Sequence, residues 1–211
     1  MTGETRGTGG TSDETLLDAW NAGDGAAGER LFDRHFVQVV RFFRTKVNGD
    51  VDELVQRTFL GCLEARHRVR GGNFEAFLFG IARNVLFNHY RAERRAGAAV
   101  DLDEVSLYDL DPRPSTILVA RREHQILLEC LRRIPVAAQL LLELHYWEGM
   151  TSAAIAEVTQ VPHGTVQTRI RRAKQLLAEQ IQRWPGGVDG PLDFDAWARS
   201  LRDQVDRGAR V

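Results

Sequence analysis

The sequence predicts an all-α fold in which two small helical domains are joined by a flexible acidic linker, with a helix-turn-helix in the second domain. Apolar residues recur at spacings of three and four along most of the 211 residues, and we find no convincing strand-like alternation. Residues 96–114, the expected linker, have five acidic residues, two prolines and no basic residue between Gly97 and Pro112. Residues 151–183 follow the order of short helix, tight turn and longer helix.

The first domain is expected over residues 11–95 and begins with two helices. A capping box of Thr11 and Glu14 opens the first helix, and Gly23-Asp24-Gly25 ends it. The second helix ends at Asn48-Gly49-Asp50. Its apolar residues lie at helical spacing and predict a buried side made of Leu31, Phe32, Phe36, Val39, Val40 and Phe43.

Two further helices are expected in this domain, at residues 51–66 and 74–95, with Asn73 as the N-cap of the latter. The apolar spacing of the first of these joins Leu54, Val55, Thr58, Phe59 and Cys62. At about 100° per residue, the other helix divides into two sides. Its buried stripe comprises Leu78, Ile81, Ala82 and Val85. The opposite side carries Arg83, Asn84, Phe87, Arg91 and Arg94, where Phe87 either stacks on a base or packs on a neighbouring helix.

The second domain is expected over residues 115–184, with a break at Pro135. Thr151 or Ser152 caps the first helix of the helix-turn-helix, and Pro162 begins the second, where its missing N–H is harmless. The second helix buries a stripe made of Val166, Ile170, Ala173, Leu177 and Ile181. Its opposite side presents Gln167, Thr168, Arg171 and Arg172. A DNA recognition helix needs this division, whereas an ordinary solvated arginine-rich face does not explain the tight turn and the proline.

The two ends of the chain are expected to lie outside these domains. Residues 1–10 are rich in Gly and Thr and predict a disordered tail. Residues 185–211 form a C-terminal extension with a Pro/Gly hinge and a short amphipathic helix over about 194–205. Such a helix is marginal alone in water, so it needs a surface: its own domain, the linker groove or a partner. The alternative is a dispensable end.

Composition and motif content exclude several classes of function. A formal net charge of −1 argues against indiscriminate coating of nucleic acid but permits a DNA binder with localised basic faces. Cys62 and Cys130 lie in helical patterns and are expected to be buried in a reducing cytosol. The sequence has no zinc-ligand spacing, catalytic triad, phosphate loop or membrane-spanning apolar run. It therefore predicts a cytoplasmic protein that is not an enzyme and has no catalytic residue, metal or cofactor.

Three segments resemble the extracytoplasmic-function (ECF) sigma factors of bacterial RNA polymerase. EGMTSAAIAEVTQVPHGTVQTRIRRAKQLL, residues 148–177, resembles the segment that reads the promoter −35 element. DELVQRTFLGCLEA, residues 52–65, and FEAFLFGIARNVLFNHYRAERR, residues 74–95, resemble the helices of the family's other domain. The resemblance extends from about Thr11 to Arg183, so the extension beyond Trp184 has no counterpart.

The resemblance implies roles for particular residues. The residues that it implies for docking on the β′ clamp helices of polymerase are Glu53, Gln56 and Phe59. The −10 element is contacted by Arg83, Asn84, Phe77 and Arg91, with Asn84 beside a pocket for a flipped base. Phe74, Phe77 and Phe79 lie in the stretch associated with melting, and for these three residues core packing and DNA contact are both open. The −35 element is faced by Gln167, Thr168, Arg171 and Arg172. Departures from the pattern are Arg57, where an acidic residue is usual, and Ala153 and Ala154, where a polar pair is usual.

We therefore expect a sigma factor that binds core RNA polymerase and promoter DNA and directs promoter recognition, melting and initiation. Whether an anti-sigma protein also binds it is left open, as are the promoter sequence and the inducing signal. The main rival function is that of a helix-turn-helix regulator that acts without polymerase. A second rival is a protein that only occupies the sigma site on polymerase, and a DNA-cleaving enzyme is a more remote one.

Overall fold

The computed structural model describes residues 11–49, 51–69, 73–93, 101, 104–113, 117, 122–186 and 194–209. Its helices are α1 (Asp13–Asn21), α2 (Gly25–Arg44), α3 (Val51–Ala65), the 3-10 helix η1 (Arg66–Arg68), α4 (Phe74–Glu93), α5 (Leu107–Leu110), α6 (Arg122–Arg132), α7 (Val136–Tyr146), α8 (Ser152–Thr159), α9 (His163–Gln182) and α10 (Phe194–Ala209). Across these ranges no strand occurs, apart from one isolated bridge between Ser106 and Pro135. The all-α prediction is confirmed.

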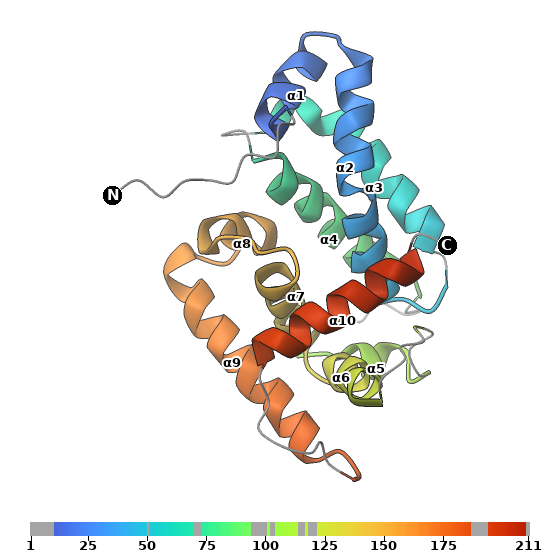
Figure 1. Ribbon diagram of the computed structural model, residues 1–211, viewed down its shortest axis with the longest axis vertical. Coiled ribbons are helices and arrows are strands. Elements are labelled where there is room, and N and C mark those ends of the chain that lie inside the picture. Colours follow the sequence, from blue (N-terminus) through green and yellow to red (C-terminus); the bar gives the residue numbers. More distant parts are fainter. Residues whose placement is uncertain are drawn as a thin grey trace.

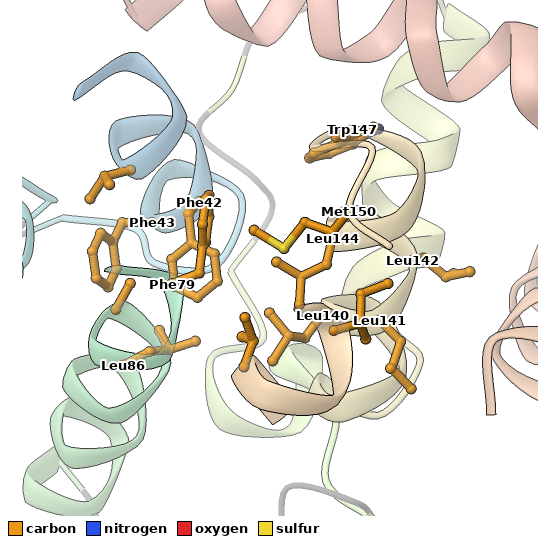
Figure 2. Close-up of a cluster of buried hydrophobic side chains, with 14 of the residues drawn as sticks. Phe42, Phe43, Phe79, Leu86, Leu140, Leu141, Leu142, Leu144, Trp147 and Met150 are labelled. Carbon is orange, nitrogen blue, oxygen red and sulfur yellow. The ribbon is translucent and has the colours of Figure 1, made fainter. Parts of the chain in front are cut away.

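Helices α1–α4 lie together in one half of the molecule and α5–α9 in the other, while α10 crosses between the two halves (Figure 1). In the first half, Phe42 of α2 makes edge-to-face contacts with Phe43 and with Phe79 of α4, and these rings are almost completely buried. In the second half the core is mainly aliphatic and includes a buried indole, and the residues labelled in Figure 2 are Leu140, Leu141, Leu142, Leu144, Trp147 and Met150. The two sets of side chains face one another, with Met150 on the side of the first half (Figure 2).

Most of the predicted helix starts are observed. Asn73 Oδ1 accepts from the backbone N–H of Ala76, and Thr151 Oγ1 accepts from that of Ala154, as N-caps do. The capping box of Thr11 and Glu14 is wrong, because Ser12 Oγ caps α1 by accepting from the N–H of Thr15. Hydroxyl residues occupy both positions, so local sequence does not choose between them.

Tertiary contacts explain the choice of Ser12. With α1 beginning at Asp13, the carboxylate of Asp13 reaches Nε2 of the buried His35 on α2, at 2.7 Å. Leu16 and Leu17 of the same helix enter the core. The carbonyl of Thr11 accepts from Nη2 of Arg34 on α2 at 2.8 Å, so a contact with α2 holds Thr11 just before the helix.

Phe36 is a second correction. Its spacing predicts the buried side of α2, but it is 46% exposed, because it lies at the border of the buried stripe. Its ring stacks on that of Phe59, with centroids 6.2 Å apart and an interplanar angle of 12°. Phe36 therefore belongs to the surface between α2 and α3.

The acidic linker contains structure that the sequence reading did not anticipate. Ser106 and Asp109 form a capping box that starts the one-turn helix α5, and Leu107 is completely buried. The carbonyl of Val105 accepts from the N–H of Val136, which holds this part of the linker against α7. Residues 96–100, 102–103 and 114 of the linker lie outside the described residues, and the domain boundaries stay predictions.

At the C-terminal end, the expected amphipathic helix is present as α10 and continues to Ala209, beyond the predicted end near Val205. Its Leu201 and Val205 are buried, so it does cover a surface. The tail at 1–10 and the hinge residues 187–193 lie outside the described residues. Cys62 and Cys130 are buried free thiols, as predicted. Within the described residues, no helix combines the length and the hydropathy that crossing a bilayer would require.

The contact between α1 and α2 gives a prediction about stability. A Cβ added to Gly28 of α2 would lie 2.5 Å from Nε1 of the buried Trp20, and the rigid indole would have to shift. Gly28→Ala should lower the melting temperature, with a loss of about 1–3 kcal/mol from overpacking, although Ala in a helix usually gains about 1 kcal/mol over Gly.

Gly80 of α4 is the matched control, because nothing lies within 4 Å of a Cβ built there. Gly80→Ala should leave stability unchanged or raise it. Thermal unfolding followed by circular dichroism measures both variants. A Gly28→Ala variant at least as stable as the parent would contradict the packing described for Trp20.

Candidate nucleic-acid interface

Helix α9 has the two sides that a recognition helix requires. Its predicted stripe is buried, from Val166 at 0% exposure to Ile181 at 3%. Its predicted reading residues are all exposed: Gln167, Thr168, Arg171 and Arg172. Because the stripe fixes the rotation of the helix on its domain, the reading face points into solvent, where side chains can reach base edges.

The turn before α9 sets the angle of this helix. Helix α8 ends at Thr159, and Gln160 then adopts a left-handed conformation with φ of 58°. Pro162 is the N-cap of α9, one position before the place predicted for it. Across the turn, Nε2 of Gln167 donates to Oγ of Ser152 at 2.5 Å, so one reading side chain is held by the neighbouring helix.

On α4, the residues assigned to the −10 element occupy one side of the helix. Asn84 and Arg91 are exposed, and Phe77 is half-buried. The guanidinium of Arg83 lies over the ring of Phe87, 4.2 Å from its centroid. This cation–π contact joins two residues of the same helix. The half-buried ring of Phe87 also packs against the core, as one of the two alternatives expects, and base stacking by this ring stays a prediction.

Phe74 and Phe79, in the aromatic stretch associated with melting, follow the core-packing alternative. Both are completely buried. Phe74 contacts the rings of Trp20 and His35, and Phe79 contacts that of Phe42. These two residues fill the space between α1, α2 and α4 and are not available to DNA, so Phe77 alone of the three reaches the surface.

The surface of α3 carries the residues assigned to polymerase docking. Glu53 and Gln56 are exposed, and Phe59 is half-buried with its ring 4.7 Å from that of Phe32. Arg57, the departure from the family pattern, forms an exposed ion pair with Glu53 one turn away. Such a pair contributes little to stability, but it occupies the carboxylate of Glu53.

The sequence reading missed the apolar part of this surface. Leu60 is 49% exposed and Leu63 41%, and Phe36 lies beside Phe59 at the border with α2. The available signal was that Leu60 and Leu63 fall outside the stripe that joins Leu54 to Cys62. Exposed large apolar side chains gathered on one face mark an interaction surface.

A cleft of about 250 Å³ separates α4 from the helix-turn-helix. Arg83 of α4 lines one wall, and Gln160, Pro162 and Arg169 line the other. Of the residues predicted to contact DNA, Arg83 therefore faces this cleft, whereas Gln167, Thr168, Arg171 and Arg172 of α9 do not line it.

Comparisons with known proteins agree with this geometry. The family model described as Sigma-70 region 2 matches residues 31–96, and that described as Sigma-70, region 4 matches residues 124–177. The ECF RNA polymerase sigma-E factors of Salmonella typhimurium and Escherichia coli are each 25% identical over 181 residues, covering 81% of this chain and 95% of theirs. The structure of CnrH in complex with the cytosolic domain of CnrY shares the fold, with a TM-score of 0.58 and 23% identity over 79% of this chain and 95% of that one.

The exposed face of α9 leads to a prediction about sequence reading. Arg171→Ala and Arg172→Ala should each weaken DNA binding. Loss of an arginine that reads a base should cost about 1–3 kcal/mol and relax the preference at one position, whereas loss of a phosphate contact should weaken all sequences alike. Selection from a random DNA library measures the preference.

Arg183→Ala is the control, because Arg183 is an exposed arginine just beyond the C-terminal end of α9. It should leave the selected sequence unchanged. If both test variants select the same sequence as the parent chain, neither arginine reads bases.

Proposed function

Because this chain belongs to the ECF group of the sigma-70 family, we propose that it binds core RNA polymerase and directs it to promoters, where it opens the DNA for initiation. The observation that carries the proposal is the pairing of an exposed reading face on α9 with a first half that matches Sigma-70 region 2. In this proposal the chain has two domains, at residues 11–95 and 115–184, which are joined by the acidic stretch 96–114. The chemistry of RNA synthesis stays with the polymerase, and this chain is not an enzyme.

The −35 element is read by α9 in the major groove. Gln167 and the two arginines have side chains that make paired hydrogen bonds to adenine and guanine edges. Thr168 is short and suits contact with a phosphate or a thymine methyl group. The bond from Gln167 to Ser152 orients the amide before DNA arrives, which lowers the entropy lost on binding.

The −10 element is opened at α4. Flipping a base out of a duplex costs a few kcal/mol, which a protein offsets by binding the flipped base. Asn84 supplies an exposed amide for the base edge, and Phe77 supplies an aromatic surface. Arg83 and Arg91 add positive charge for the phosphates of the separated strand.

Polymerase binds the surface formed by α3 and the exposed edge of α2. Glu53 and Gln56 provide its polar part, while Phe59 supports the exposed apolar side chains beside it. Two modest DNA contacts on one polymerase give useful affinity through effective concentration. We place the protein in the cytoplasm, where the reducing conditions suit its two free thiols.

In vitro transcription tests the proposal. Purified chain and core polymerase are incubated with a genomic library, and start sites are mapped. Starts should depend on the chain and share two upstream elements. Tight, specific DNA binding by the chain alone, with no dependence on polymerase, would instead identify a conventional helix-turn-helix regulator.

The docking surface generates its own prediction. Gln56→Ala combined with Leu60→Ala should weaken binding to core polymerase by about 1–2 kcal/mol, which is five- to thirty-fold. Both residues are exposed, so the fold should survive, as circular dichroism can verify. Phe59 is a poorer choice because its ring packs on Phe32.

Asp18→Ala on α1 is the control, because it removes an exposed side chain from another helix of the same domain. Its affinity for polymerase should equal that of the parent chain. A folded double variant with undiminished affinity would remove α3 from the docking interface.

A further inference from the structure

Helix α10 packs against both halves of the molecule. Its buried stripe of Ala198, Leu201 and Val205 has the spacing of one helix face. In Figure 1 it runs diagonally from the side of α7 and α9 to the lower end of α2, and it contacts both α2 and α7. A helix placed in this way joins the two halves.

Polar contacts fix α10 at three points. Asp206 forms an ion pair with Arg41 of α2. Arg202 Nη1 donates to the carbonyl of Trp147 at 3.1 Å, and Gln204 Nε2 lies 2.7 Å from Nδ1 of the buried His124 on α6. The helix is therefore bonded to the first half through one residue and to the second half through two.

The contact between the halves combines facing apolar side chains with buried charge (Figure 2). Arg41 donates to both carboxylate oxygens of Glu148, at 2.6 and 2.8 Å through Nη2, and both side chains are 3% exposed. Lys46, completely buried after the end of α2, pairs with Glu143 of α7. Both bases belong to the first half and both acids to the second.

Such an interface suits a reversible contact. Taking charges out of water costs about as much as their attraction returns, so a buried ion pair gives little net adhesion, and both partners are well solvated when it opens. Burial raises the pKa of Glu148 although Arg41 opposes this, which shows how strongly the carboxylate is desolvated. The apolar stripe of α10 adds attraction that the charged contact lacks.

In this arrangement the helix that carries the predicted −10 residues is packed directly against the helix-turn-helix. Helix α4 packs against α8, and Arg83 and Arg169 line the same cleft. Elements near −10 and −35 are about 25 base pairs apart, or roughly 85 Å at 3.4 Å per base pair. Binding both elements requires the halves to separate.

We propose that α10 is an intramolecular ligand of the surface formed by α2 and α7, and that it holds the free chain closed until polymerase separates the halves. The inference rests on the proposed function for its consequence, but not for its geometry. The occupant is this chain's own segment 194–209, because Asp206 complements Arg41, the apolar stripe is buried, and attachment in the same chain gives it a high effective concentration.

Distance measurements test the closed state. Spin labels are attached at Asp18→Cys on α1 and Gln175→Cys on α9, both exposed positions. The native thiols should not react, because burial raises the pKa of Cys62 and of Cys130 to about 12. Double electron–electron resonance then measures the distance between the two labels, and so the separation of the halves, in the full chain.

Asp206→Arg is the test variant, because it places a second positive charge against Arg41. A basic residue near the C-terminal end of α10 is favoured by the helix dipole, so the helix itself is not weakened. Asp195→Arg makes the same charge change at an exposed position in the first turn, at the other end of the helix from Asp206. Because a basic residue there opposes the helix dipole, this variant weakens the helix more than the test variant does and is a stringent control. Leu201→Ala removes the apolar contact as an independent variant.

The label separation should increase in Asp206→Arg and in Leu201→Ala but not in Asp195→Arg. If about nine-tenths of free chains are closed, apparent affinity for core polymerase should rise up to about tenfold in the two opened variants. An unchanged separation in both, with circular dichroism showing an intact fold, would overturn the docking of α10.

Larger separation without tighter polymerase binding would overturn the claim that closure limits function. If neither the parent chain nor any variant binds polymerase, the proposed function fails. The distances between the labels would still show whether α10 holds the halves together.

Discussion

The way in which the two halves meet depends on the buried charge pairs Arg41–Glu148 and Lys46–Glu143, which add little net adhesion but must stay paired while they are buried. Lys46 is at their centre. Its ammonium donates to the carbonyl of Phe42 and to Oγ1 of Thr45, and it pairs with Glu143. Its own carbonyl accepts from the hydroxyl of Tyr90 on α4. One residue thus joins α2, α4 and α7, and removal of its partner would leave a charge in the interior without compensation.

The functional surfaces follow from what this interface leaves uncovered. The mixed apolar and polar face of α3 lies away from the contact, as does the basic face of α9. The −10 side of α4, by contrast, borders the cleft with the helix-turn-helix. Under the proposed function, the surface proposed for polymerase is free in the closed molecule, while the surface proposed for the −10 element is partly enclosed. The proposal therefore includes an order of events, in which polymerase engages first and DNA second.

Local sequence predicted correctly those features that depend on residues within one helix. The stripe of α9, the caps at Asn73 and Thr151 and the break at Pro135 all depend on residues within a turn or two of each other. The wrong predictions involve residues for which neighbouring positions were nearly equivalent. Thr11 and Ser12 are both good caps, and Phe36 is at the border of a stripe, so a distant partner decided each case.

The sequence by itself determined the all-α class, the helix-turn-helix and the family, because hydrophobic periodicity, helix capping and sequence motifs are properties of short segments. Only the tertiary structure decided which charges are buried and where α10 docks. Arg41 and Glu148 are 107 residues apart, and Arg41 and Asp206 are 165 apart. Nothing in the neighbourhood of Arg41 distinguishes it from a solvated arginine, since the partner that stabilises its burial is brought to it only when the chain folds.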